Sequence, residues 1–178
     1  MTLEEIEDLI RMVPDFPKPG ILFRDITTLM ADGAGFSATV GYLAEDALSR
    51  DVDAIAGIEA RGFIFGAAVA ARLSLPFIPI RKPGKLPVPV LAMDYALEYG
   101  TDTLEIDPDA IASGQRILLV DDLIATGGTA HAAVALLRKA GAEVPAAQFV
   151  IDLPDLAGAD RLRKEGVAVT ALIAFPGH

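Results

Sequence analysis

Residues 117–129 read ILLVDDLIATGGT, a stretch that joins an apolar run to a pattern of helical spacing. The apolar residues predict a buried strand over 116–121, and the spacing that follows predicts a helix from Gly128 to Ala140. In a parallel sheet the ligand crevice lies at the carboxyl ends of the strands, where the positive end of the next helix attracts anions. The stretch therefore predicts an α/β fold with an anion site after this strand.

The loop between this strand and this helix is suited to a phosphate group. Gly127 and Gly128 carry no Cβ atom, so a phosphate can approach the backbone, and the flanking threonines offer hydroxyl donors. No Gly-Lys-Ser/Thr ending follows, so the loop differs from a nucleoside-triphosphate P-loop and fits a phosphate monoester. The residues predicted to bind this phosphate are Ala125, Thr126, Gly127, Gly128 and Thr129.

Asp121 and Asp122 are predicted to serve one ligand together. Neighbouring side chains on a strand point to opposite faces, so both acids reach one ligand only where the chain leaves the strand, and the pair is expected at that exit. Two carboxylates near a bound phosphate can accept hydrogen bonds from the vicinal hydroxyls of a ribose 5-phosphate. In the alternative interpretation Asp122 caps the helix and the glycines only turn the chain. The paired acids favour the ligand.

The rest of the chain alternates strands with helices. Its 178 residues suit one domain with a substantial core. Apolar spacing predicts helices at 3–12, 35–50, 62–73 and near 156–166, strands at 53–58, 77–81, 144–152 and 167–175, and a hairpin at 91–99 and 103–106. We expect a single α/β domain, residues 1–178, with a mostly parallel central sheet flanked by helices.

Composition excludes several classes of function. Lysine and arginine total 15 against 25 acids, and the net charge of −10 repels a nucleic-acid backbone. The chain has no cysteine, which excludes disulfides and thiol nucleophiles. No apolar run reaches the roughly 18 residues of a membrane span, and the acidic start MTLEEIEDLI is unlike a signal peptide. We expect a cytoplasmic protein that binds small molecules, without nucleic-acid or membrane partners.

The quoted stretch closely resembles the phosphoribosyl-diphosphate signature of the type I phosphoribosyltransferases. Three further stretches narrow the resemblance to the adenine-specific members: DFPKPGILFRDIT at 15–27, GIEARGFIFG at 57–66, and IRKPGKLP with YALEYG at 80–100. The resemblance implies a small N-terminal hood over the base at 1–33, and a mobile lid loop with a hairpin at 82–100. It also implies transfer of a phosphoribosyl group from 5-phosphoribosyl 1-diphosphate to N9 of adenine, giving AMP and diphosphate in purine salvage. Mg²⁺ would enter with the sugar substrate, without a directly assigned protein ligand, and the enzyme would be a homodimer.

The predicted base site combines an extended segment with more distant residues. An extended backbone offers a C=O and an N–H that match the 6-amino donor and N1 acceptor of adenine. The resemblance implies that the backbones of Leu22 and Arg24 read this edge, that the Phe23 ring stacks on the base, and that Ile124 contributes to the pocket. It also implies that Glu98 exchanges a proton with N7 of adenine. The alternatives are that Leu22 and Phe23 are core residues and that Glu98 is merely solvated.

A second anion site is predicted around GIEARG. Its glycine-flanked turn precedes a helix of small residues, and Arg61 can grip a diphosphate with two hydrogen bonds. The resemblance implies a cis peptide bond between Glu59 and Ala60, and a cationic lid that excludes water. The alternatives are a surface salt bridge for Arg61 and a solvated loop for the cations. The residues assigned to the diphosphate are Glu59, Ala60, Arg61, Arg81, Lys82 and Lys85.

The catalytic assignment rests on Glu98, Asp121 and Asp122, with the two aspartates beneath the sugar ring. His131 and His178 receive no role.

Two rival functions stay open. One is a phosphoribosyltransferase for another base, such as a 6-oxopurine or orotate, and the FPKPGILFRD stretch argues against it. The other is a non-catalytic regulator that senses the sugar diphosphate and binds nucleic acid, and the net charge of −10 disfavours such binding.

Overall fold

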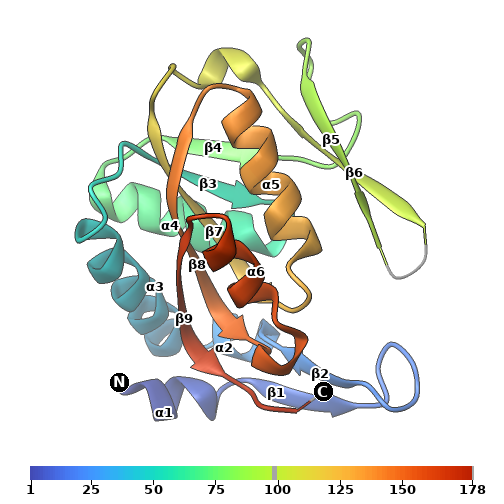
Figure 1. Ribbon diagram of the computed structural model, residues 1–178. Coiled ribbons are helices and arrows are strands. Elements are labelled where there is room, and N and C mark those ends of the chain that lie inside the picture. Colours follow the sequence, from blue (N-terminus) through green and yellow to red (C-terminus); the bar gives the residue numbers. More distant parts are fainter. Residues whose placement is uncertain (98–99, 178) are drawn as a thin grey trace.

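The computed structural model describes residues 1–97 and 100–177 of the chain (Figure 1). Among these residues, no helix is both long and apolar enough to cross a membrane. The elements along the chain are α1 (Leu3–Glu7), β1 (Arg11–Pro14), β2 (Leu22–Asp25), α2 (Thr27–Ala31), α3 (Gly33–Leu48), β3 (Ala54–Ile58), α4 (Arg61–Leu73), β4 (Phe77–Ile80), β5 (Leu91–Ala96), β6 (Thr101–Ile106), η1 (Pro108–Ala110), β7 (Arg116–Ile124), α5 (Gly128–Lys139), β8 (Glu143–Asp152), η2 (Pro154–Leu156), α6 (Gly158–Lys164) and β9 (Ala168–Ala174).

The main sheet has five parallel strands in the order β4-β3-β7-β8-β9, which confirms the predicted single-domain α/β fold. Helices α3 and α4 cover one face and α5 and α6 the other (Figure 1). Neighbouring residues of β7 supply both cores: Leu118 packs with Leu43 and Phe65, whereas Leu119 packs with Leu136 and the rest of the opposite cluster. Because both faces are covered, the strands read as apolar runs rather than as an alternating pattern.

The N-terminal region differs from the prediction. The expected helix over 3–12 ends at Glu7, and the chain then forms β1, which pairs antiparallel with β2. Ile6 and Ile10 are both buried, as their helical spacing predicts. Ile10, however, lies in a turn after the helix, where its N–H donates to the Glu7 carbonyl. Pairing with β2, a strand later in the chain, decides the structure here. Helix α2 was also missing from the prediction.

The predicted hairpin is confirmed as β5 and β6, which form a separate two-stranded sheet. It projects from the upper right of the molecule in Figure 1. A backbone bridge between Arg81 and Glu105 connects it to the end of β4. Leu104 and Ile106 are fully buried and belong to the same core as helix α5, so one face of the hairpin packs on the domain.

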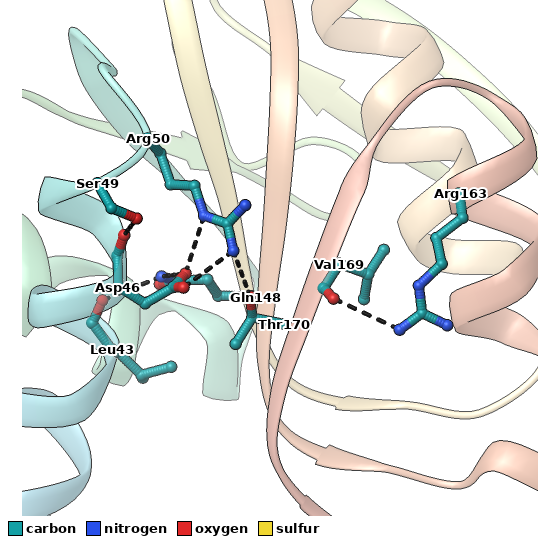
Figure 2. A network of polar contacts seen from close by, with 8 residues as sticks. All are labelled: Leu43, Asp46, Ser49, Arg50, Gln148, Arg163, Val169 and Thr170. Carbon is teal, nitrogen blue, oxygen red and sulfur yellow. Dashed lines mark hydrogen bonds and ion pairs between the residues drawn. The ribbon is translucent and has the colours of Figure 1, made fainter.

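A polar network fastens α3 to the sheet far from the quoted loop (Figure 2). Asp46 accepts hydrogen bonds from the Arg50 guanidinium at 2.9 Å and from the Gln148 amide at 2.7 Å. Arg50 also donates to the Thr170 hydroxyl at 2.8 Å, and Gln148 donates to the Leu43 carbonyl at 3.0 Å. The network therefore joins α3 to both β8 and β9.

Candidate active site

The predicted phosphate loop closes the carboxyl end of β7. Helix α5 begins at Gly128, and its N-cap Gly127 has a left-handed φ of 80°, which glycine adopts without strain. Among the described residues no side chain caps this N-terminus, and Asp122 lies within β7, so the helix-cap interpretation of Asp122 is wrong. A cavity of about 220 Å³ opens here, and its lining includes all five residues assigned to the phosphate: Ala125, Thr126, Gly127, Gly128 and Thr129.

The two acids occupy this cavity for a different reason from the predicted one. Strand β7 continues to Ile124, so the chain does not leave the strand at Asp121 and Asp122. Val120 and Leu123 nevertheless pack in the same core cluster although they are three positions apart, an odd number. An unbroken strand would place them on opposite faces. The alternation therefore slips at the two acids, and both of them line the loop cavity.

Asp121 is held beneath the start of α4. Its Oδ1 accepts a hydrogen bond from the Asp122 N–H at 2.9 Å. Burial of the carboxyl and the charge of Asp122 raise the pKa of Asp121 well above its usual value. A Cβ atom on Gly62 would lie 2.8 Å from this Oδ1, so only glycine leaves room for the carboxyl. The sequence interpretation used the glycines of GIEARG to form a turn and missed this packing role.

The diphosphate candidates meet the acids in an adjoining cavity of about 330 Å³, whose lining residues are Ile58, Glu59, Ala60, Arg61, Lys82, Asp121, Asp122 and Thr129. The peptide bond between Glu59 and Ala60 is cis, as predicted. Arg61 Nε lies 2.6 Å from Asp122 Oδ2, so the arginine does form a salt bridge, but with a residue of the site rather than with the outer surface. Half of the Arg61 side chain stays exposed, so it can turn to a ligand.

The lid cations are paired with acids. Arg81 Nε lies 3.3 Å from Glu59 Oε2, and the Lys82 N–H donates to the same oxygen at 2.8 Å. The hydrogen bond from Lys82 is the largest cause of the lowered pKa of Glu59. The Lys82 ammonium pairs with Asp102 and donates to the Tyr95 hydroxyl at 2.9 Å, so Tyr95 and Asp102 are functional candidates that the sequence did not reveal. These contacts fix Lys82 against the hairpin.

Lys85 differs from the other lid cations. Its carbonyl accepts a hydrogen bond from Arg81 at 3.3 Å, and its side chain is exposed. Neither Lys85 nor Arg81 is among the residues that line the two cavities, whereas Lys82 lines the second. The mobility of the lid stays a prediction.

Three of the predicted base residues, Leu22, Phe23 and Arg24, lie on β2. Leu22 and Phe23 are half-buried, so neither is the fully buried core residue of the alternative interpretation, and the Phe23 ring packs edge-on against Phe16 at 5.1 Å. Arg24 is buried, and its guanidinium donates to the Leu22 carbonyl. Ile124 lines the loop cavity, whereas the three residues of β2 do not. Glu98 lies outside the described residues, and so does Tyr99.

Gly158 supports the phosphate loop from behind. Its N–H donates to the Ala125 carbonyl at 3.0 Å, and a Cβ on Gly127 would lie 2.9 Å from the Gly158 Cα. Two glycine backbones therefore meet without side chains between them. His131 of α5 pairs with Glu165 at the end of α6. This contact also holds α5 and α6 together. No sequence pattern indicated that segments so distant along the chain meet here.

The fold and the site together define a phosphoribosyltransferase. The model of the phosphoribosyl transferase domain family matches residues 36–170. Adenine phosphoribosyltransferase of Novosphingobium aromaticivorans is 65% identical over 178 residues, which is 100% of both chains. The crystal structure of adenine phosphoribosyltransferase from Thermoanaerobacter pseudethanolicus matches with a TM-score of 0.92 and 48% identity, over 98% of this chain and 100% of that chain.

A third relative was crystallised with ligands. Adenine phosphoribosyltransferase of Saccharomyces cerevisiae, in complex with an imino-altritol bisphosphate and adenine, matches with a TM-score of 0.89 and 35% identity, over 96% of this chain and 98% of that chain. The chain described here belongs to the adenine phosphoribosyltransferase family.

Proposed function

We propose that the chain transfers the 5-phosphoribosyl group of 5-phosphoribosyl 1-diphosphate to N9 of adenine, releasing AMP and diphosphate, as a step of purine salvage. The observation that carries this function is the meeting of two adjoining cavities at one edge of the sheet. One is floored by the glycine loop, the other is lined by Arg61 and Lys82, and Asp121 and Asp122 line both. A ligand with a phosphate at one end of a ribose and a diphosphate at the other fits this arrangement.

Two groups of residues hold the sugar. The N–H groups at the start of α5, with the hydroxyls of Thr126 and Thr129, receive the 5-phosphate. Asp121 and Asp122 accept hydrogen bonds from the ribose hydroxyls. Positive charge builds on the ribose ring as the diphosphate leaves, and carboxylates beneath the ring stabilise that charge more than they stabilise the neutral substrate.

The leaving diphosphate is received by cations around the Glu59–Ala60 turn. Arg61 moves from Asp122 to the diphosphate, and Arg81, Lys82 and Lys85 supply further positive charge. The described residues contain no cluster of three or more potential metal ligands. Mg²⁺ would be held mainly by substrate oxygens, with at most the carboxylates of Asp121 and Asp122 from the protein. Bound there, Mg²⁺ would neutralise charge on the diphosphate.

The base approaches from the hood. The Leu22 carbonyl and the Arg24 N–H face the amino group and N1 of adenine, Phe23 stacks on the ring, and Ile124 packs from the sheet. A purine with the reverse pattern leaves buried groups unpaired, at a cost of about 1–3 kcal/mol each. Glu98 exchanges a proton with N7 while N9 attacks C1 of the ribose.

One assay tests the reaction and its rivals. The protein is incubated with 5-phosphoribosyl 1-diphosphate, Mg²⁺ and one base at a time, and nucleotide formation is followed by chromatography. AMP from adenine, with far less product from hypoxanthine, guanine or orotate, is expected. Nucleotide from hypoxanthine but not adenine would indicate a 6-oxopurine enzyme, and no nucleotide from any base would favour a non-catalytic sensor.

Variants test the assigned residues. Asp121→Ala is expected to raise the KM for the sugar diphosphate, because ribose hydroxyls lose an acceptor. Glu98→Ala is expected to lower kcat by about 10²–10⁴, the usual contribution of general acid–base catalysis. A Glu98→Ala enzyme with the kcat of the wild type would remove Glu98 from the mechanism. Crystals soaked with AMP should hold its phosphate against residues 125–129.

Assembly and location complete the proposal. A homodimer is supported by family resemblance. Light scattering on the purified protein measures its mass, and a monomer at micromolar concentration would contradict the dimer. A cytoplasmic location is the other part of this proposal. Cell fractionation tests it.

A further inference from the structure

The segment after β9 is fastened to the sheet at two points. The Phe175 N–H donates to the Asp152 carbonyl of β8 at 3.0 Å. Two residues later, the Gly177 N–H donates to the Asp155 carboxylate at 2.7 Å. Asp155 belongs to the short helix η2, between β8 and the glycine that supports the phosphate loop. The segment Phe175–Gly177 is thereby held along the carboxyl edge of the sheet.

The same segment holds the hood. Arg24 of β2 donates through Nη2 to the Gly177 carbonyl at 3.3 Å, and its guanidinium lies 5.6 Å from the centre of the Phe175 ring. Figure 1 shows the chain after β9 running beside β1 and β2. Among the described residues, the buried guanidinium donates through its two Nη atoms to carbonyl oxygens and has no carboxylate partner, and its buried Nε has no hydrogen-bond partner. A guanidinium held this way depends on the exact placement of those carbonyls.

Arg24 links the Gly177 carbonyl to the backbone of β2. Its Nη1 donates to the Leu22 carbonyl, which is the acceptor assigned to the adenine amino group. A carbonyl oxygen has two lone pairs, so it can accept from Arg24 and from the base together. The guanidinium thus orients the carbonyl, and the Gly177 carbonyl orients the guanidinium. The path ends at Asp155, which fixes Gly177.

We propose that Asp155 is a positioning residue for adenine binding, acting through Gly177 and Arg24 on the backbone of β2. The inference rests on the base site of the proposed function. Asp155 contacts neither the phosphate loop cavity nor the diphosphate cavity. Its loss therefore affects the base selectively and leaves the sugar diphosphate in place.

The test separates the two substrates. Asp155→Ala removes one hydrogen bond from the path, so the KM for adenine is expected to rise about three- to tenfold, with the KM for the sugar diphosphate unchanged. Asp155→Asn keeps an oxygen acceptor and is expected to restore the KM for adenine to within about twofold. Asp107→Ala is the matched control, because Asp107, the N-cap residue of the short 3-10 helix η1, also accepts a backbone N–H, at 2.9 Å. It should leave both KM values unchanged.

Two results would overturn the inference. One is an Asp155→Ala enzyme whose KM for adenine matches that of the wild type. The other is an equal rise of both KM values that Asp155→Asn does not reverse, which would indicate general loosening of the fold. Phe23→Ala separates this failure from failure of the base site itself. If Phe23→Ala raises the KM for adenine while Asp155→Ala does not, only the coupling is wrong. If neither does, the assignment of the base to β2 is wrong as well.

Discussion

Replacing Gly158 by alanine is expected to displace the phosphate loop. Its Cβ would lie 2.3 Å from the Ala125 carbonyl oxygen and 2.6 Å from the Gly127 nitrogen. Ordinary van der Waals contact begins at 3.4 Å, and both neighbours are backbone atoms that cannot rotate away. Relieving the contact requires the loop and α6 to separate by about 1 Å. The displacement also weakens the hydrogen bond from Gly158 to Ala125.

A shift of this size matters because the loop positions the reacting sugar. Misplacing a substrate by ~1 Å can cost ~10²-fold in rate. We therefore expect kcat/KM for 5-phosphoribosyl 1-diphosphate to fall about 10- to 100-fold in Gly158→Ala. Steady-state kinetics with varied sugar diphosphate at saturating adenine measures the fall, and calorimetry with the sugar diphosphate alone measures its binding.

The matched control is Gly33→Ala. Gly33 also begins a helix, but a Cβ there meets nothing within 4 Å, so activity should be unchanged. Thermal unfolding of both variants checks that each is folded at the assay temperature. If folded Gly158→Ala bound and used the sugar diphosphate as the wild type does, the loop would not depend on this glycine contact, and the argument would fail.

Three further variants test the electrostatics. Asp121→Asn is expected to lower activity but to raise Tm at pH 7. Because the pKa of Asp121 is raised in the folded protein, its ionised form destabilises the fold as pH rises above about 3.8. The Tm gain of the variant should therefore grow with pH, and a gain independent of pH would contradict this. For Asp46, burial raises the pKa, but hydrogen bonds from Arg50 and Gln148 outweigh it, so the pKa is lowered. Asp46→Ala should therefore lower the free energy of unfolding by about 2 kcal/mol at pH 7, and this loss should shrink as pH falls below 3.8. Equal losses at pH 7 and pH 3 would refute the argument. Arg61→Met should weaken diphosphate inhibition about 10- to 100-fold, and unchanged inhibition would exclude Arg61 from the diphosphate site.

The central sheet and the phosphate loop could be predicted because their signals are local. A strand covered on both faces must be apolar along its length, as DAIAGI and ILLV are. A backbone that approaches a ligand closely needs glycine, which Gly127 and Gly128 supply. The cis bond after Glu59 came instead from resemblance to a known family. All of these features are contained in short stretches of sequence.

Features that depend on distant segments could not be predicted. Residues 11–14 become a strand because β2 pairs with them, which outweighs their helical spacing. The partner of Lys82 is Asp102, twenty residues later on β6, and the role of Gly158 depends on its contact with Ala125. The end of β7 was misplaced because the pairing of Ile124 with Asp152 in β8 continues the strand past the acids. Such contacts have no signature within one stretch.

The ion pairs of Arg61 with Asp122, of Arg81 with Glu59 and of Lys82 with Asp102 have a kinetic consequence. Each of these cations already has a counter-ion, and the net charge of the protein is −10. The cations therefore attract an incoming polyanion only weakly from beyond one Debye length, about 8 Å at physiological ionic strength. Entry of the sugar diphosphate is then an exchange of anions at short range. Its association rate should depend only weakly on added salt, unlike that of enzymes that steer their substrates electrostatically.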